Sequence, residues 1–122
     1  VPLTLNTPGG QITYWRAVTM YATSYSPCRL GIPNYCNNVT FSGAILQKGI
    51  AAVTRYMYGL IGGSTVYVPG YGTARIADVG SGVFGQNWID LGYSDADFTS
   101  WGKTVTVYFI WPPPADISWV LP

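Results

Sequence analysis

Two aspartates stand at the ends of a glycine-rich segment in the middle of the chain. Asp78 closes the apolar run ARIAD, Asp90 closes the run WID, and Gly80 and Gly82 lie between them. Because each aspartate follows apolar residues, we expect it at the end of a strand, and the glycines let the backbone turn back sharply. The loop should bring the two carboxylates near each other, which raises the pKa of one of them. A carboxyl group with a raised pKa can protonate a glycosidic oxygen.

The same two aspartates also have a simpler explanation. Side chains of this type often accept hydrogen bonds from nearby loop amides, so Asp78 would cap the loop and Asp90 a turn. On composition alone, capping is the slightly better explanation.

The composition excludes several kinds of chemistry. The 122 residues include no histidine and no glutamate, and all five acids are aspartates: Asp78, Asp90, Asp95, Asp97 and Asp116. A Ser-His-Asp site, a Cys-His site and a histidine-ligated metal are therefore impossible. The scattered aspartates lack a metal-binding loop pattern, so we expect no metal and no cofactor. With a net charge of +1 and no long apolar run, we expect neither nucleic acid nor a membrane span.

The two cysteines lie in a loop-forming segment, SPCRLGIPNYCNN. We expect Cys28 and Cys36 to form a local disulfide, because only Arg29 is close enough to lower the pKa of a thiol. A disulfide indicates an oxidising compartment, so the protein is expected to be secreted.

The pattern of β-branched and aromatic residues predicts an all-β domain. Six short strands are expected, over residues 14–25, 49–55, 64–70, 71–78, 87–93 and 104–111. Residues 56–63 form a helical turn or loop, and residues 94–101 one or two helical turns with Ser94 as the N-cap. Residues 1–13 are expected to be an N-terminal arm or linker, and residues 112–122 a C-terminal tail. Six strands with so little helix indicate a small closed barrel or a sandwich.

Five stretches of the chain, in this order, resemble one known family. They are YATSYSP (21–27), FSGAILQKGIAAV (41–53), STVYVPGYGTARIADVGSG (64–82), WIDLGYSD (88–95) and WGKTVTVY (101–108). Together they resemble the three-aspartate (3D) domain family, whose members are double-psi β-barrels. That barrel is similar to the catalytic barrel of membrane-bound lytic transglycosylase A and to the stationary-phase survival muralytic proteins. The resemblance implies a six-stranded double-psi β-barrel over residues 14–111, with one or two short helices.

The resemblance also implies an activity and roles for single residues. Asp90 matches the catalytic acid/base, Asp78 the supporting aspartate, and Asp95 is the nearest candidate for the third family aspartate. The implied reaction cuts the bond between N-acetylmuramic acid and N-acetylglucosamine in cell-wall peptidoglycan and leaves 1,6-anhydro ends.

Further residues are predicted to contact the glycan. Thr23 would present a hydroxyl to the sugar, although threonine also simply favours strands. Ser42 and Gly43 match the family's SG element, although a plain turn explains them equally well. Tyr71 would stack on a sugar ring, while Trp88 is expected in the core. The full set predicted to bind substrate is Thr23, Tyr21, Ser42, Gly43, Tyr71, Gly80, Ser81 and Asp95.

Two other functions remain open on the sequence. One is a non-catalytic polysaccharide-binding barrel similar to expansins and barwin-like domains. The other is a structural or partner-binding module attached to a larger chain.

Overall fold

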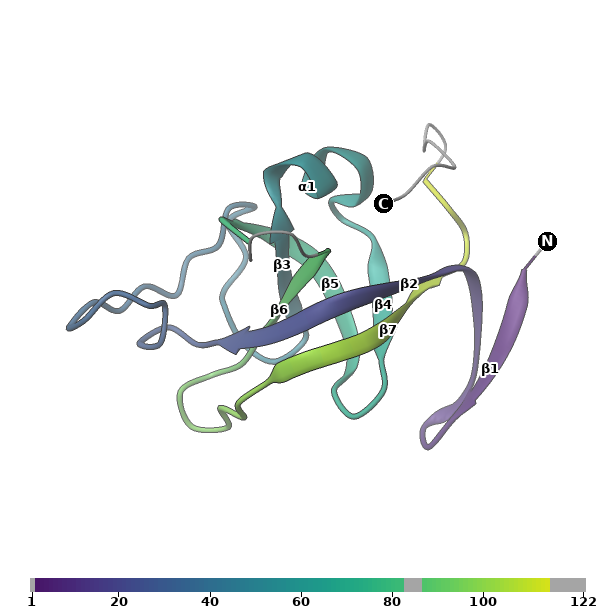
Figure 1. Cartoon of the computed structure of the whole chain (residues 1–122), viewed down its shortest axis with the longest axis horizontal. Helices are drawn as coiled ribbons and strands as arrows, with labels where there is room; N and C mark the ends of the chain where they lie inside the picture. The colour runs from purple at the N-terminus through teal and green to yellow at the C-terminus, as the bar shows by residue number, and fades with distance from the viewer. Residues whose placement is uncertain (1, 83–86, 115–122) are drawn as a thin grey trace.

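The computed structural model describes residues 2–82 and 87–114, and most of them lie in strands (Figure 1). One helix in this part of the chain, α1 (Arg55–Ile61), separates the third strand from the fourth. The strands are β1 (Leu3–Thr7), β2 (Gly10–Tyr25), β3 (Ile50–Thr54), β4 (Thr65–Val68), β5 (Gly72–Gly80), β6 (Trp88–Gly92) and β7 (Gly102–Ile110).

Six of the strands close into a barrel. Their order is β2-β6-β3-β5-β4-β7, and the pairing of β7 with β2 closes the ring. The pairs β2–β6 and β3–β5 are parallel, and the other pairs in the ring are antiparallel. The predicted closed six-stranded, all-β barrel is therefore confirmed, and closure leaves no open edge in the ring itself.

Apolar side chains of the strands form two clusters. The larger one fills the barrel interior, and the smaller one lies on the outer face. In β3, Ala51 and Val53 belong to the main core, whereas Ala52 between them belongs to the second cluster. Likewise in β6, Ile89 faces the main core and Trp88 the second cluster. Because successive side chains point to opposite faces of a strand, the second cluster lies outside the barrel. The segment between β2 and β3 contributes Leu46 to this cluster.

One local prediction gains detail and another is wrong. Within the predicted arm, β1 pairs with the first part of β2 in a β-hairpin that extends beyond the barrel (Figure 1). The predicted helical turns over residues 94–101 are absent. Ser94 and Asp97 still bond to each other as in a capping box: the Asp97 carboxylate accepts bonds from the backbone N–H and the hydroxyl of Ser94 at 2.8 Å each, and the N–H of Asp97 donates to the Ser94 hydroxyl at 3.4 Å. These bonds close one turn, and no helix follows it.

The remaining elements agree with the sequence except at their ends. Residues 56–63 form most of α1, whose N-cap is Thr54; its hydroxyl accepts a bond from the N–H of Met57. Of the predicted tail, Pro112–Pro114 are described, and residues 115–122 lie outside the described part of the chain.

Candidate active site

Four residues on four neighbouring strands form a row across the outer face of the barrel. Thr23 in β2 pairs with Asp90 in β6, Asp90 pairs with Ala52 in β3, and Ala52 pairs with Asp78 in β5. Residues paired across a sheet point to the same face. The backbone pairing itself therefore places both carboxylates and the threonine hydroxyl on one surface.

A β-bulge puts Asp78 into this row. Ala51 pairs with Ile76, but Ala52 pairs with Asp78, so Ala77 is the extra residue in β5. If Ala77 paired regularly with Ala52 instead, Asp78 would alternate onto the interior face of the strand. The carbonyl of Ala77 accepts a hydrogen bond of 3.1 Å from the N–H of Ser42, which docks the preceding loop against the bulge.

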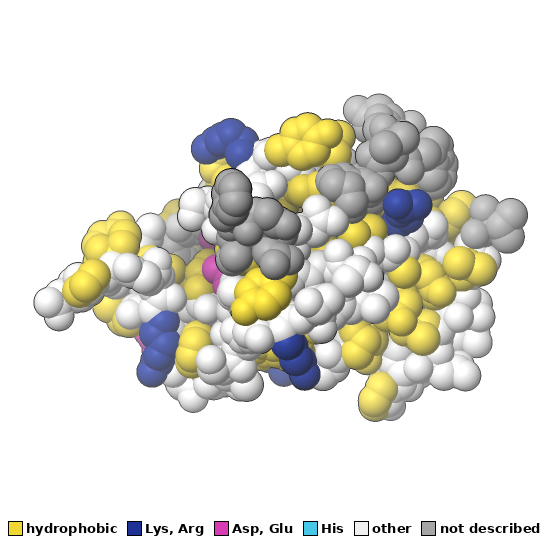
Figure 2. Space-filling model, viewed as in Figure 1, with side chains coloured by type: hydrophobic (Ala, Val, Ile, Leu, Met, Phe, Trp, Pro, Cys, Tyr) yellow, Lys and Arg dark blue, Asp and Glu magenta, His cyan; other side chains and the backbone are white. Residues whose placement is uncertain are grey.

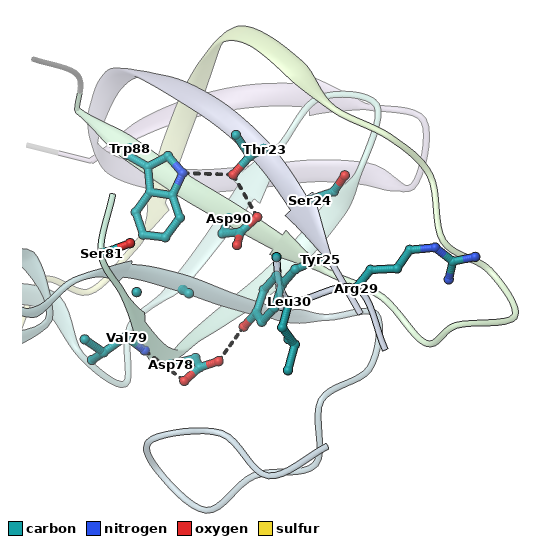
Figure 3. Close-up of a pocket in the computed structure, with 13 residues that line it drawn as sticks. Thr23, Ser24, Tyr25, Arg29, Leu30, Asp78, Val79, Ser81, Trp88 and Asp90 are labelled. Carbon is teal, nitrogen blue, oxygen red and sulfur yellow. Dashed lines mark hydrogen bonds between the residues drawn. The ribbon is translucent and has the colours of Figure 1, made fainter. Parts of the chain in front are cut away.

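The row lies in a cavity of about 420 Å³ (Figure 3). One wall is the end of β5 and the residues after it, and another comes from the segment after β2, with Arg29, Leu30 and Gly31. The volume is within the range of about 300–1,000 Å³ that is usual for small-molecule sites. The lining residues are Thr23, Ser24, Tyr25, Arg29, Leu30, Gly31, Ala52, Asp78, Val79, Gly80, Ser81, Trp88 and Asp90.

Asp90 is the carboxyl group with the raised pKa. Burial in the cavity raises the pKa of Asp90 from 3.8 to about 6, and the negative charge of Asp78 contributes in the same direction. The hydrogen bond from the Thr23 hydroxyl to Asp90 Oδ1, at 2.8 Å, opposes this shift. Asp90 can therefore hold a proton or release it near neutral pH, as a general acid/base requires.

Thr23 links Asp90 to an aromatic side chain. The Trp88 indole Nε1–H donates a 2.8 Å hydrogen bond to Thr23 Oγ1, whose own proton goes to Asp90 (Figure 3). Trp88 is fixed in turn by Gly80, where an added Cβ would lie 2.4 Å from the indole ring. The chain Trp88–Thr23–Asp90 therefore holds one carboxylate oxygen in a set direction.

Asp78 is engaged on both of its oxygens. Oδ1 accepts bonds from the backbone N–H groups of Phe41 and Val79, both at 2.9 Å, and Oδ2 accepts one of 2.7 Å from the Tyr25 hydroxyl. Burial and the bond to this carboxylate raise the pKa of Tyr25, so the hydroxyl stays protonated as a donor. The capping expected of Asp78 is thus observed, together with its place beside Asp90.

The two carboxylates are neighbours without touching. They flank Ala52, which puts their backbones two strand spacings apart, about 10 Å. Within the described residues each carboxylate is hydrogen-bonded to its own partners and none of these bonds joins the two. The carboxylates are therefore not in contact, contrary to the expectation from the loop, and Asp78 acts on Asp90 only through its charge.

Three residues predicted to bind substrate line the cavity: Thr23, Gly80 and Ser81. Residues 83–86 of the same loop lie outside the described part of the chain. Tyr21 is half-buried beside the second cluster, two residues before Thr23, and does not line the cavity.

Tyr71 cannot stack on a sugar, because its side chain is 4% exposed in the main core. Its hydroxyl accepts a 2.7 Å bond from the N–H of Gly49 and donates one of 2.6 Å to the carbonyl of Gly92. Burial raises the pKa of Tyr71 to about 12, so this hydroxyl ties two backbone segments together as a neutral group.

Ser42, Gly43 and Asp95 also lie away from the cavity. Ser42 and Gly43 form a turn in which the N–H of Gly43 bonds to the carbonyl of Thr40 at 2.9 Å. Asp95 accepts bonds from the Ser26 hydroxyl at 2.7 Å and from the N–H of Cys28 at 3.0 Å, and these bonds lower its pKa. Its role is to anchor the start of the disulfide loop.

The predicted disulfide is present. Cys28 and Cys36 are bonded, and the loop that they close carries Arg29, Leu30 and Gly31 into the cavity wall. The Arg29 guanidinium points away from the cavity in Figure 3 and forms an ion pair of 3.5 Å with Asp95.

Two residues have roles at this site that the sequence did not predict, Tyr25 and the core residue Trp88. Tyr25 follows Tyr21 and Thr23 at the spacing of two that marks one face of a strand, and this signal would have found it. Trp88 is buried, as expected, yet its indole N–H bonds to a site residue.

Within residues 2–82 and 87–114, no group of three or more Cys or Asp side chains is placed to hold a metal ion. The same residues include no helix long and apolar enough to cross a bilayer.

Comparisons with known protein families, with curated proteins and with solved structures found no match for this chain.

Proposed function

We propose that this protein is a secreted enzyme that cleaves cell-wall glycan in the manner of a lytic transglycosylase. Its substrate is the bond between N-acetylmuramic acid and N-acetylglucosamine in peptidoglycan. The observation that supports this most is Asp90: an acid with a pKa of about 6, in a cavity, with one oxygen held by Thr23. The sequence resemblance to the three-aspartate family supplies the substrate.

In the first step, protonated Asp90 gives its proton to the glycosidic oxygen, and the bond between that oxygen and the anomeric carbon breaks. The resulting carboxylate then takes the proton of the C6 hydroxyl of the muramic residue. The C6 oxygen bonds to the anomeric carbon, which closes the 1,6-anhydro ring. Asp90 ends the cycle protonated, as it began.

The state of Asp78 favours this route over hydrolysis. Ordinary hydrolysis needs a second carboxylate, as nucleophile or as base for water. Three hydrogen bonds hold both oxygens of Asp78, so neither oxygen is free to attack a sugar or to take a proton from water. Asp78 is therefore suited to raising the pKa of Asp90 by its charge, and Asp90 acts in both steps.

The disulfide supports the proposed location. A disulfide persists in oxidising compartments, which include the cell exterior where peptidoglycan lies.

The test is the variant Asp90→Asn, with Asp97→Asn as a matched control because Asp97 caps a turn away from the cavity. Each protein is incubated with purified sacculi, and the soluble products are analysed by mass spectrometry. We expect anhydro-ended fragments from the wild type and Asp97→Asn, and none from Asp90→Asn. Full activity in Asp90→Asn would overturn the assignment. Sacculi that are bound but left intact by the wild type would instead support the non-catalytic binding barrel.

A further inference from the structure

Next to the cavity, an arginine lies over an exposed aromatic ring. We propose that Arg55, whose guanidinium lies over the Phe41 ring, binds a carboxylate group of the glycan and makes the site select acidic over neutral glycans. This inference takes its glycan from the proposed function and adds the chemical class that the site distinguishes.

Phe41 is fixed to the site through its backbone. Its N–H donates to Asp78 Oδ1 at 2.9 Å, and Ser42, the next residue, is bonded to the bulge at Ala77. The ring packs edge-to-face on Tyr58, with 5.1 Å between ring centroids, and is nevertheless 54% exposed. Phe41 is thus an exposed ring held beside a site aspartate.

Arg55 lies over this ring, with Cζ 5.1 Å from the centroid of Phe41. It follows Thr54, which pairs with the cavity residue Gly80, so its backbone begins at the cavity wall. On the face shown in Figure 2, few acidic atoms are visible, and hydrophobic side chains lie beside those in the middle of the face. A guanidinium that lies over a ring can still offer its N–H groups to a carboxylate.

Arg55 has no acidic partner in the part of the chain that the structure describes, where the ion pair is the one between Arg29 and Asp95. It is also exposed and lies in the first turn of α1, which contains no acid. A cation gains nothing from the helix dipole at that end. A residue that local structure does not favour is typical of a functional position.

The ligand that fits is a carboxylate attached to a sugar. The cavity itself carries Asp78 and Asp90, which repel an anionic glycan, so a cation near the cavity offsets that repulsion. N-acetylmuramic acid carries such a group on its lactyl ether, whereas a chitin-type oligomer of N-acetylglucosamine carries none. Arg55 therefore distinguishes the two glycans by charge.

The experiment measures binding in the Asp90→Asn background, so that cleavage plays no part. The probes are peptide-free peptidoglycan strands with free lactyl carboxylates, the same strands as methyl esters, and a neutral N-acetylglucosamine oligomer. We expect the free acid to bind best, and Arg55→Gln to weaken its binding about tenfold or more. Binding of the ester should not change. Arg75→Gln, which removes an exposed arginine elsewhere on β5, is the matched control and should bind like its parent.

Two further variants separate charge from shape. Arg55→Lys keeps the charge without the planar fork and should recover only part of the affinity, and Phe41→Leu should weaken binding of the acid by removing the stacking surface. Equal binding of acid and ester before any change at Arg55, or an unchanged preference in Arg55→Gln, would overturn the subsite. Anhydro products without a carboxylate preference would reject the subsite alone, and a preference without cleavage would reject only the proposed reaction.

Discussion

The Thr23 hydroxyl donates a 2.8 Å hydrogen bond to Asp90 across the parallel pair β2–β6, in which the two residues are direct partners. The barrel itself therefore fixes this contact, because the same strands form its wall. Thr23 also accepts the indole N–H of Trp88 at 2.8 Å. The Thr23 hydroxyl thus links Trp88 of the second cluster to Asp90 in the cavity.

Removing that hydroxyl should raise the pKa of Asp90 further. In Thr23→Val, Asp90 loses a donor that stabilises its charged form, so its pKa should rise above the wild-type value of about 6. Trp88 also loses its acceptor, which should lower the free energy of unfolding by about 1–3 kcal/mol. Carboxyl NMR titration and urea unfolding measure the two effects. Thr23→Ser retains the hydroxyl and should show neither, and an unchanged Asp90 titration in Thr23→Val would contradict the assigned bond.

The buried acid should also make stability depend on pH. The folded-state pKa of Asp90 is about 6 and its usual value is 3.8. The folded state therefore binds this proton more tightly, and the stabilisation present below pH 4 is lost as the pH rises through 6. Asp90→Asn does not titrate, so its stability relative to the wild type should increase by up to about 3 kcal/mol between pH 4 and pH 7.5. Urea unfolding at both pH values tests this, and a constant difference would speak against a raised pKa.

The proposed reaction has its own pH dependence. Because the first step needs protonated Asp90, kcat/KM should fall about tenfold per pH unit above pH 6. In Thr23→Val this fall should begin at a higher pH. Initial rates on soluble glycan strands from pH 4.5 to 8.5 measure it. A rate that stays constant through pH 8 would show that Asp90 is not the acid.

Gly80 should tolerate no side chain. A Cβ there would lie 2.4 Å from Trp88 Cη2, so Gly80→Ala should displace the indole and break its bond to Thr23. We expect a loss of about 1–3 kcal/mol in unfolding free energy. Gly59→Ala is the control: Gly59 lies in α1 with nothing within 4 Å of its added Cβ, and alanine should stabilise the helix by up to about 1 kcal/mol. Equal stabilities of the two variants would contradict the close packing of Gly80 and Trp88.

The disulfide should act on substrate binding as well as on stability. Cys28 and Cys36 are eight residues apart, and for such a loop the entropy of closure corresponds to about 2.5 kcal/mol. Changing both cysteines to serine should lower the free energy of unfolding by about that amount. Because the loop forms one wall of the cavity, KM should also rise by a larger factor than kcat falls. Wild type treated with dithiothreitol should reproduce the effect. An unchanged KM in both would show that the wall keeps its position without the bond.

Local patterns predicted the elements that form the barrel. The alternation of apolar and polar residues located the strands, and the turn residues Pro69 and Gly70 located the β4–β5 hairpin. These elements depend on the residue types within a few positions, so the sequence alone suffices to predict them. The raised pKa of one aspartate was predicted from repulsion between two close carboxylates, whereas burial of Asp90 is the larger cause and the charge of Asp78 a smaller one.

Features that depend on pairing between distant strands were not predictable in the same way. The position of Ala52 between the two aspartates follows from β3 lying between β5 and β6, which no local pattern reveals. The Tyr71 hydroxyl can be buried because it bonds to two segments that are each about twenty residues away in the sequence. Phe41 reaches Asp78 across 37 positions of sequence.

The extra residue in β5 gives this strand two successive side chains on the outer face, Ala77 in the second cluster and Asp78 in the cavity. Deleting Ala77 would leave Asp78 directly after the interior residue Ile76 and still opposite Ala52, so the row of site residues would remain. The deletion would instead remove the residue whose carbonyl accepts the N–H of Ser42. In an alignment, a single gap at this point would therefore mark chains that keep the paired acids but hold the Phe41 loop differently.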